Sequence, residues 1–224
     1  ISVYGDALRR KGTVDREAGR FLIRALFVTI TNAAWDDDAI IEWIRGGLEV
    51  REGVAERARA AGAAPEALPD CAVWTASGKD EIAAKANSPE VRVNAMENED
   101  VRSLRELLII GTKGIAAYAE HAEVLGFEKD EIYASMMEGL ASTTKELSVD
   151  DMVAMVMKTG ENAVATMALL DEANTKTYGN PEITEVNLGV RGNPGILISG
   201  HDLKDMEELL KQTEGTGVDV YTHG

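Results

Sequence analysis

The chain has 224 residues, 45% of them hydrophobic, which is enough to bury a core in one domain or two small ones. Its 39 acidic residues against 23 lysines and arginines give a formal charge of -16, which argues against nucleic acid or an anionic membrane surface as partner. No apolar run approaches the roughly 20 residues that span a bilayer, and no basic stretch followed by an apolar one marks a secretory signal. We therefore expect an acidic cytoplasmic protein.

The single cysteine, Cys71, lies in an irregular stretch without a nearby Cys or His partner. It cannot form an internal disulfide, and we interpret it as a partly buried small apolar residue rather than a reactive thiol. The chain as given therefore cannot build a metal centre from several thiolates.

An internal repeat predicts the architecture of the first three quarters of the chain. Residues 101–125 carry apolar positions at helical spacing, with Asn98 as the N-cap and Gly126 as the stop. A second helix is expected from Glu128 to about Lys145, and a third opens at Ser148 in a sequence that resembles a capping box. Shifting the sequence by 114 positions aligns this unit with the start of the chain: Tyr4 on Tyr118, Gly12 on Gly126, Leu26 on Leu140, and Asp36 and Asp37 on Asp150 and Asp151.

The repeat predicts a mainly α fold with two packed three-helix bundles. We place the helical domain at residues 1–192, with a first bundle at about 1–60, a connector at about 61–96 broken by prolines, a second bundle at about 97–174 and a linker at 175–192. The first unit starts at Ile1, the equivalent of Ile115 in mid-helix, so we expect a fragment of a longer protein. Six methionines on the predicted helices are expected to fill the core: Met136, Met137, Met152, Met155, Met157 and Met167.

Residues 193–224 predict the opening of a Rossmann-like, doubly wound α/β domain. Apolar runs at 195–199 and 218–221 flank an amphipathic segment at about 203–211, the pattern of a strand, a helix and a parallel strand. The unit is incomplete, because such a pair needs further strands beside it. The glycines of "GTGVD" follow a helix and precede a strand, the reverse of a dinucleotide fingerprint, so we expect no nucleotide site there.

Three stretches resemble a known family: "NEDVRSLRELLIIGTKGIAAYAEHAEVLGF", "LLDEANTKTYGNPEIT" and "NPGILISGHDLKDMEELLKQTEGTGVDVYTHG". They are similar to the hybrid cluster, or prismane, proteins, which are hydroxylamine reductases related to the carbon monoxide dehydrogenases. The resemblance covers nearly the whole chain and is weak only over the connector. It implies an N-terminal iron-sulfur cluster and a hybrid iron-sulfur-oxygen cluster, whose cysteine ligands this chain lacks.

The resemblance implies one surviving metal ligand. The histidine of the family's "SGHD" stretch binds iron of the hybrid cluster, and His201 occupies that position. The residue pattern agrees, because a loop after the carboxyl end of a parallel strand is where open sheets place ligands and imidazole is a suitable iron donor. Without the resemblance, a hydrogen-bonded loop residue would be the simpler interpretation.

Three further polar residues were weighed for the same site. Thr31 matches a family threonine on the substrate side of the cluster, although Thr31 and Asn32 could equally end one helix and cap the next. His223 resembles the histidine that precedes a cluster-binding glutamate, so it could act only behind a ligand. His121 lies in a long helix and is interpreted as a surface or packing residue.

Two functions remain open at this point. The resemblance implies that the parent protein reduces hydroxylamine to ammonia and water, or nitric oxide to nitrous oxide, with electrons from a redox partner. The alternative is a metal-free helical scaffold or interaction fragment without activity of its own. We expect the remaining domains of the parent, a small nitrogenous substrate and the redox partner to be its partners, and neither nucleic acid nor membrane.

Overall fold

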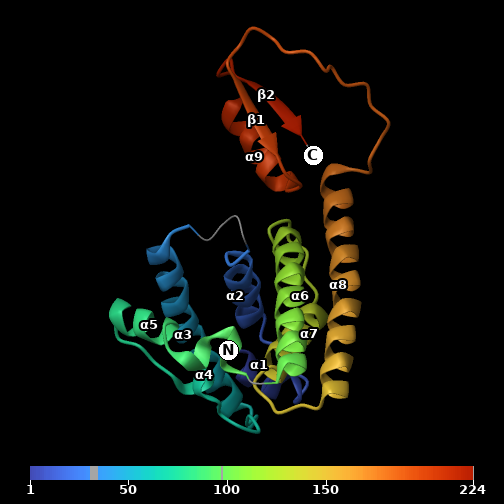
Figure 1. Cartoon of the computed structure of the whole chain (residues 1–224). Coiled ribbons are helices and arrows are strands. Elements are labelled where there is room, and N and C mark those ends of the chain that lie inside the picture. The colour runs from blue at the N-terminus through green and yellow to red at the C-terminus, as the bar shows by residue number, and fades with distance from the viewer. Residues whose placement is uncertain (31–34, 97, 224) are drawn as a thin grey trace.

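A computed structural model of the chain describes residues 1–30, 35–96 and 98–223. Within them the protein is mainly helical, as predicted, with one small sheet (Figure 1). The elements are α1 (Ser2–Arg9), α2 (Arg16–Phe27), α3 (Asp37–Ala60), α4 (Asp70–Val73), α5 (Lys79–Ala86), the 3-10 turns η1 (Pro89–Val91) and η2 (Val93–Ala95), α6 (Glu99–Glu123), α7 (Asp130–Ser142), α8 (Val149–Tyr178), β1 (Gly195–Ser199), α9 (Leu203–Thr213) and β2 (Asp219–His223).

The helix boundaries follow the internal repeat. Helix α2 begins at Arg16 and α7 begins at Asp130, 114 residues later, and the side chains of these two residues form a surface ion pair of 2.6 Å. The turns that precede them each contain a glycine of positive φ, 81° at Gly12 and 84° at Gly126. Only glycine adopts this backbone readily, so both turns end a helix at equivalent positions.

The caps of the third helices explain where those helices start. Asp36 caps α3 by accepting hydrogen bonds from the backbone N–H groups of Asp38 and Ala39. Ser148 caps α8 by accepting from the Asp151 N–H. The predicted Asp pairs therefore lie at the first turns of α3 and α8, where negative charge is favourable beside the positive end of the helix dipole. Helix α8 continues to Tyr178, beyond the predicted end of the second bundle at about residue 174.

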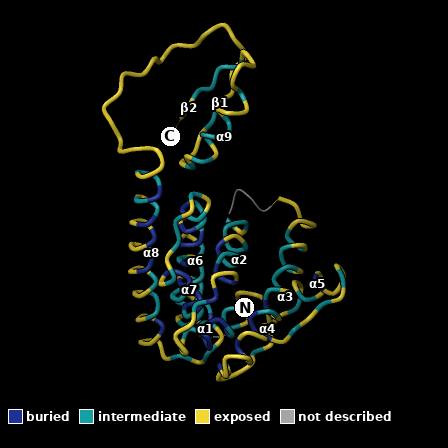
Figure 2. Tube along the Cα trace, turned by 180° about the vertical axis from the view of Figure 1, so that it is seen from behind, coloured by how far each residue is buried: buried dark blue, intermediate teal, exposed yellow. Residues whose placement is uncertain are grey.

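The two units share a common core. Helix α2 packs on α6, and α1 packs on α7, so each contact joins one helix from each unit. One cluster of buried side chains groups Ile23 of α2 with Ile115 and Ile132 of the second unit, while another groups Leu8 with Met137. Figure 2 shows the buried residues concentrated where these helices face each other. Burial of this apolar surface is the main stabilising contribution to the helical domain.

Two glycines permit the close approach of the units. A Cβ added to Gly19 of α2 would lie 2.5 Å from Cγ of Tyr133, and one added to Gly5 of α1 would lie 2.5 Å from Sδ of Met137. Gly19 and Tyr133 are equivalent positions of the repeat. The Tyr133 hydroxyl donates to Glu128, whose carboxylate also receives two hydrogen bonds from Arg20, and this arrangement lowers the pKa of Glu128.

The methionine prediction holds for only part of the set. Met136, Met137 and Met152 are buried, as expected of core residues. Met157 and Met167 are 65% and 55% exposed, which corrects the prediction for these two. Both lie on α8, whose outer face has no neighbouring helix among the described residues, so helical spacing alone did not distinguish its two faces.

The strand pair was predicted correctly. Strands β1 and β2 are parallel, with Gly195 opposite Asp219 and Ser199 opposite His223, and α9 connects them. This unit lies beyond the upper end of α6 in Figure 1, after the irregular segment 179–194. No residue of β1, α9 or β2 that the structure describes is fully buried, and Leu197 is 72% exposed.

Candidate metal-ligand site at the end of strand β1

The turn between β1 and α9 presents His201. Strand β1 ends at Ser199, and Gly200 follows with a φ of 144°, a conformation that favours glycine. His201 is exposed, and Asp202 then opens α9 as its N-cap. The imidazole is thus placed just after the carboxyl end of a parallel strand, as the sequence predicted.

The two carboxylate oxygens of Asp202 have different partners. Its Oδ1 accepts hydrogen bonds from the backbone N–H groups of Lys204 and Asp205, at 2.8 and 3.3 Å, which caps α9. Its Oδ2 lies 3.1 Å from Nδ1 of His121, in the last turn of α6. The side chains of His121 and Asp202 are only 20% and 24% exposed, so this contact is largely screened from water.

Two other side chains define the surroundings of His121. Its ring lies against that of Phe27, the last residue of α2, with ring centroids 5.4 Å apart. Its chain neighbour Glu120 is half-buried, and burial raises the pKa of the Glu120 carboxyl, an effect that the charge of Asp202 adds to and His121 opposes. His121 therefore contacts α2 and the β1–α9 turn from its place on α6.

At the carboxyl-terminal end of the register, His223 of β2 pairs with β1. Its Nδ1 lies 3.0 Å from Oγ of Ser199, directly opposite in the sheet. Because the carboxyl ends of parallel strands meet at one edge, His201 and His223 belong to the same edge of this unit. A hydroxyl group thus contacts His223, and its role behind a ligand stays a prediction.

Two further residues were predicted to matter or to be silent, Thr31 and Cys71. Thr31, predicted on the substrate side, falls outside the described residues. Cys71 is the second residue of α4, at the end of the helical domain away from the α/β unit in Figure 1. The residue is exposed, which corrects the prediction that it is partly buried. Desolvation of the sulfur raises the pKa of the thiol, which disfavours the thiolate that iron and electrophiles require.

The described residues do not complete a metal site. Across residues 1–30, 35–96 and 98–223, no group of three or more His, Cys, Asp or Glu side chains is arranged to hold a metal ion. His201 supplies one imidazole of a suitable type at a suitable position, but an iron-sulfur cluster needs several donors, mostly thiolates. The donor set of this chain therefore fits a single ligand of a cluster and does not fit a cluster on its own.

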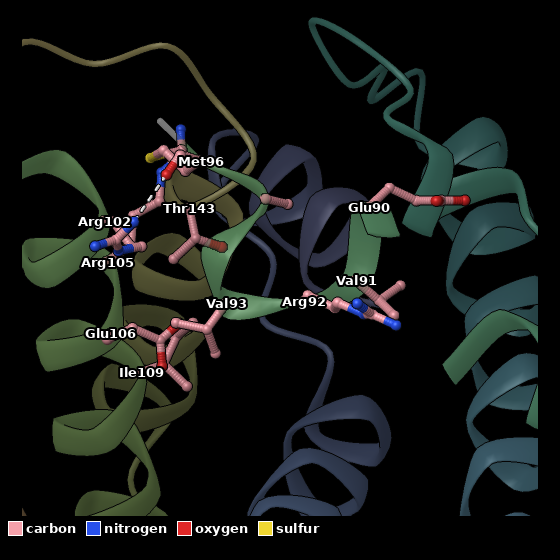
Figure 3. A pocket seen from close by; sticks show the side chains of 11 residues that line it. Glu90, Val91, Arg92, Val93, Met96, Arg102, Arg105, Glu106, Ile109 and Thr143 are labelled. Atoms are coloured by element: carbon pink, nitrogen blue, oxygen red, sulfur yellow. Dashed lines mark hydrogen bonds between the residues drawn. The ribbon is translucent and has the colours of Figure 1, made fainter. Parts of the chain in front are cut away.

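A pocket of about 390 Å³ lies away from this turn, between the connector and the helices α6 and α7 (Figure 3). Its arginines serve largely to hold backbone: Arg102 donates to the Met96 carbonyl at 3.2 Å, and Arg105 donates to the Lys145 carbonyl at 2.7 Å. These bonds tie the connector and the end of α7 to α6. Burial lowers the pKa of Arg105.

The sequence did not reveal the contact between His121 and Asp202. It correctly placed His121 on a helix and Asp202 before another, but no spacing links two residues so far apart in the chain. The available signals were the position of His121 in the last turn of α6, where a cation is favourable, and that of Asp202 at a helix start.

These observations define a mainly helical protein that leads into a parallel α/β unit with a candidate metal ligand at its strand end. The whole chain, residues 1–224, matches the model of the Prismane/CO dehydrogenase family. The chain belongs to that family, and the resemblance found in its sequence is confirmed.

Its relatives point to one activity. The chain is 68% identical over 224 residues to a hydroxylamine reductase of Desulfosudis oleivorans, and 60% identical over 230 residues to one of Nitratidesulfovibrio vulgaris. Each match takes in 100% of this chain but only 40% and 41% of the relative. The chain thus spans about two fifths of the length of these proteins. Among its described residues, no helix is long and apolar enough to cross a membrane.

Proposed function

We propose that this chain is part of a hydroxylamine reductase, in which His201 is a ligand of the hybrid iron-sulfur-oxygen cluster. The observation that carries the proposal is the place of His201, exposed after the carboxyl end of β1 and before a capped helix, in a chain 68% identical to a hydroxylamine reductase. The reaction consumes one hydroxylamine, two electrons and two protons, and yields ammonia and water. Nitric oxide is a second substrate to test.

When bound, the cluster supplies the electrons and a site where the nitrogen–oxygen group is polarised. The residues of this chain position the histidine ligand. Gly200 and the Asp202 cap set the course of the turn that carries His201 at the end of β1. We also propose that Thr31 approaches the substrate, because a hydroxyl can hydrogen-bond a small polar molecule such as hydroxylamine.

The proposal includes a second, N-terminal iron-sulfur cluster, a redox partner that supplies electrons, and a cytoplasmic location. Their support is the family membership of the whole chain and the length of the relatives that the chain does not span. A free thiol such as Cys71 also suits a reducing compartment. The competing proposal is that the 224-residue chain alone is a metal-free scaffold, because it has a single cysteine and iron-sulfur clusters are held mainly by thiolates.

One experiment distinguishes the reductase proposal from the scaffold proposal. The whole protein, meaning this chain joined to the remainder of its relatives' length, and the 224-residue chain alone are each reconstituted anaerobically with iron and sulfide. We expect ammonia from hydroxylamine with the whole protein and neither cluster nor turnover with the chain alone. His201→Ala in the whole protein should abolish most turnover and spare the N-terminal cluster. Undiminished turnover in that variant would refute the role of His201.

A further inference from the structure

A side chain directly beside His201 contacts the helical domain. Among the described residues, His121 to Asp202 and Tyr178 to Glu207 join side chains of the two regions. The first involves the residue directly after His201, whereas the second involves the second turn of α9. Of these two contacts, the first therefore acts on the turn itself.

The two carboxylate oxygens of Asp202 face different partners, which makes the contact with His121 specific. One oxygen is occupied by the N–H groups of α9, and the other faces the imidazole. Nδ1 of His121 and Oδ2 of Asp202 lie 3.1 Å apart, close enough for a direct polar contact between the imidazole and the carboxylate. The C-terminal end of α6 and the N-terminal end of α9 meet at this pair, and their dipoles have opposite signs there, which favours the approach.

The ring of His121 is itself held in place. It packs on Phe27 at the end of α2, so its position depends on α2 as well as on α6. A ring contact on one side and a carboxylate oxygen 3.1 Å from Nδ1 on the other restrict the orientation of the imidazole. The helical domain, through this ring, then determines where Asp202 and its chain neighbour lie.

We propose that His121 is a positioning residue that holds the His201 turn through Asp202. The proposal deepens the proposed function. It rests on that function only for the expected effect on the iron of the cluster. Its physical content is independent of any metal: the close polar contact of His121 with Asp202 keeps residues 199–205 in one arrangement against the helical domain, so that His201 is preorganised in its place.

Two substitutions of His121 separate the polar contact from the packing. His121→Phe keeps a ring beside Phe27 and removes the polar nitrogen. His121→Asn loses the ring but places an amide group near the position of Nδ1. Asp202→Ser removes the oxygen that faces His121, because its single hydroxyl can still cap α9. Tyr178→Phe is the matched control, since it removes the other contact and leaves the turn untouched.

Amide hydrogen exchange of the 224-residue chain at neutral pH measures the effect directly. We expect exchange in residues 199–205 to become roughly tenfold or more faster in His121→Phe and Asp202→Ser, in line with the loss of a polar contact to a carboxylate. His121→Asn should restore most of the protection, Tyr178→Phe should leave it unchanged, and the double variant His121→Phe/Asp202→Ser should be no faster than either single one.

Three results would overturn the proposal: unchanged exchange in His121→Phe with the helical domain intact, no protection regained in His121→Asn, or additive effects in the double variant. Because this measurement involves no iron, it stands or fails separately from the proposed function. In the whole protein, His121→Phe should also alter the electron paramagnetic resonance signal of the hybrid cluster, and His121→Asn should retain it. An unchanged signal in His121→Phe would contradict the consequence at His201.

Discussion

The helical domain and the α/β unit are stabilised in different ways. Helices from the two repeats interlock around shared clusters of fully buried side chains, with glycines at the closest approaches. Strands β1 and β2 and helix α9 bury no described residue completely, and polar contacts attach them to the helices. The difference shows that a small unit can be well placed beside a stable domain without a core of its own, and it predicts different responses to the same substitution.

The largest expected difference comes from shortening an isoleucine in each region. Ile23 is fully buried in the helical core, and Ile23→Ala should lower the free energy of unfolding by about 2–5 kcal/mol, because it removes apolar contacts and leaves a cavity. Ile196 of β1 is 38% exposed, and Ile196→Ala should cost less than about 1 kcal/mol. Thermal and urea unfolding measure both. Equal losses would contradict the contrast between the regions.

The next effect tests the close approach of the two repeats. Gly19→Ala would bring a Cβ against the buried ring of Tyr133 and should destabilise the protein by about 1–3 kcal/mol. Gly160→Ala is the matched control, because no neighbouring atom lies within 4 Å of the added Cβ and alanine is the better helix former. We expect it to stabilise the protein by roughly 0.5–1 kcal/mol. If both variants had the same sign, the packing argument would be wrong.

The smallest effect concerns the attachment of α9. The Glu207 carboxylate binds Lys211, the Tyr178 hydroxyl and Lys204, and these contacts lower its pKa from 4.5 to about 2. Because the pKa of Glu207 is lower in the folded state, the contribution of Glu207 to the stability of the fold is complete above pH 4.5. That contribution is lost as the pH falls through about 2. Because these groups are exposed, solvent screening keeps the contribution modest.

Nuclear magnetic resonance of α9 amides between pH 6 and 2 checks this dependence. The wild-type α9 signals should change only below pH 4.5, and Glu207→Gln should lack the step. A Glu207 titration centred near 4.5, or a step that persists in the variant, would show that the attachment does not involve this carboxylate.

The sequence predicted most of the fold because its signals are local. Asn98, Ser148 and Asp36 are caps beside apolar periodic segments, and the positive-φ glycines fall between helices. The parallel strand pair followed from the strand-helix-strand pattern. Such features depend on neighbours in the chain, so a single sequence reveals them.

The rest of the site depends on distant parts of the chain. His121 was correctly placed on a helix, but its contact with Asp202 arises only when α6 and α9 meet. The exposed Met157 and Met167 were assigned to the core because periodicity marks an apolar position without saying whether another helix covers it. The contact of His121 and the exposure of the two methionines both depend on how distant helices pack, which the local sequence pattern does not determine.

The most direct test of the account asks whether the His201 imidazole is bonded to iron in the whole protein. Pulsed electron paramagnetic resonance of the hybrid cluster detects hyperfine coupling to a directly bonded nitrogen, and histidine labelled with ¹⁵N identifies its source. We predict a histidine nitrogen coupling in the wild-type protein that is absent from His201→Gln, with the N-terminal cluster signal unchanged in both. The same coupling in His201→Gln, or no histidine coupling in the wild type, would contradict the assignment of His201 as a cluster ligand.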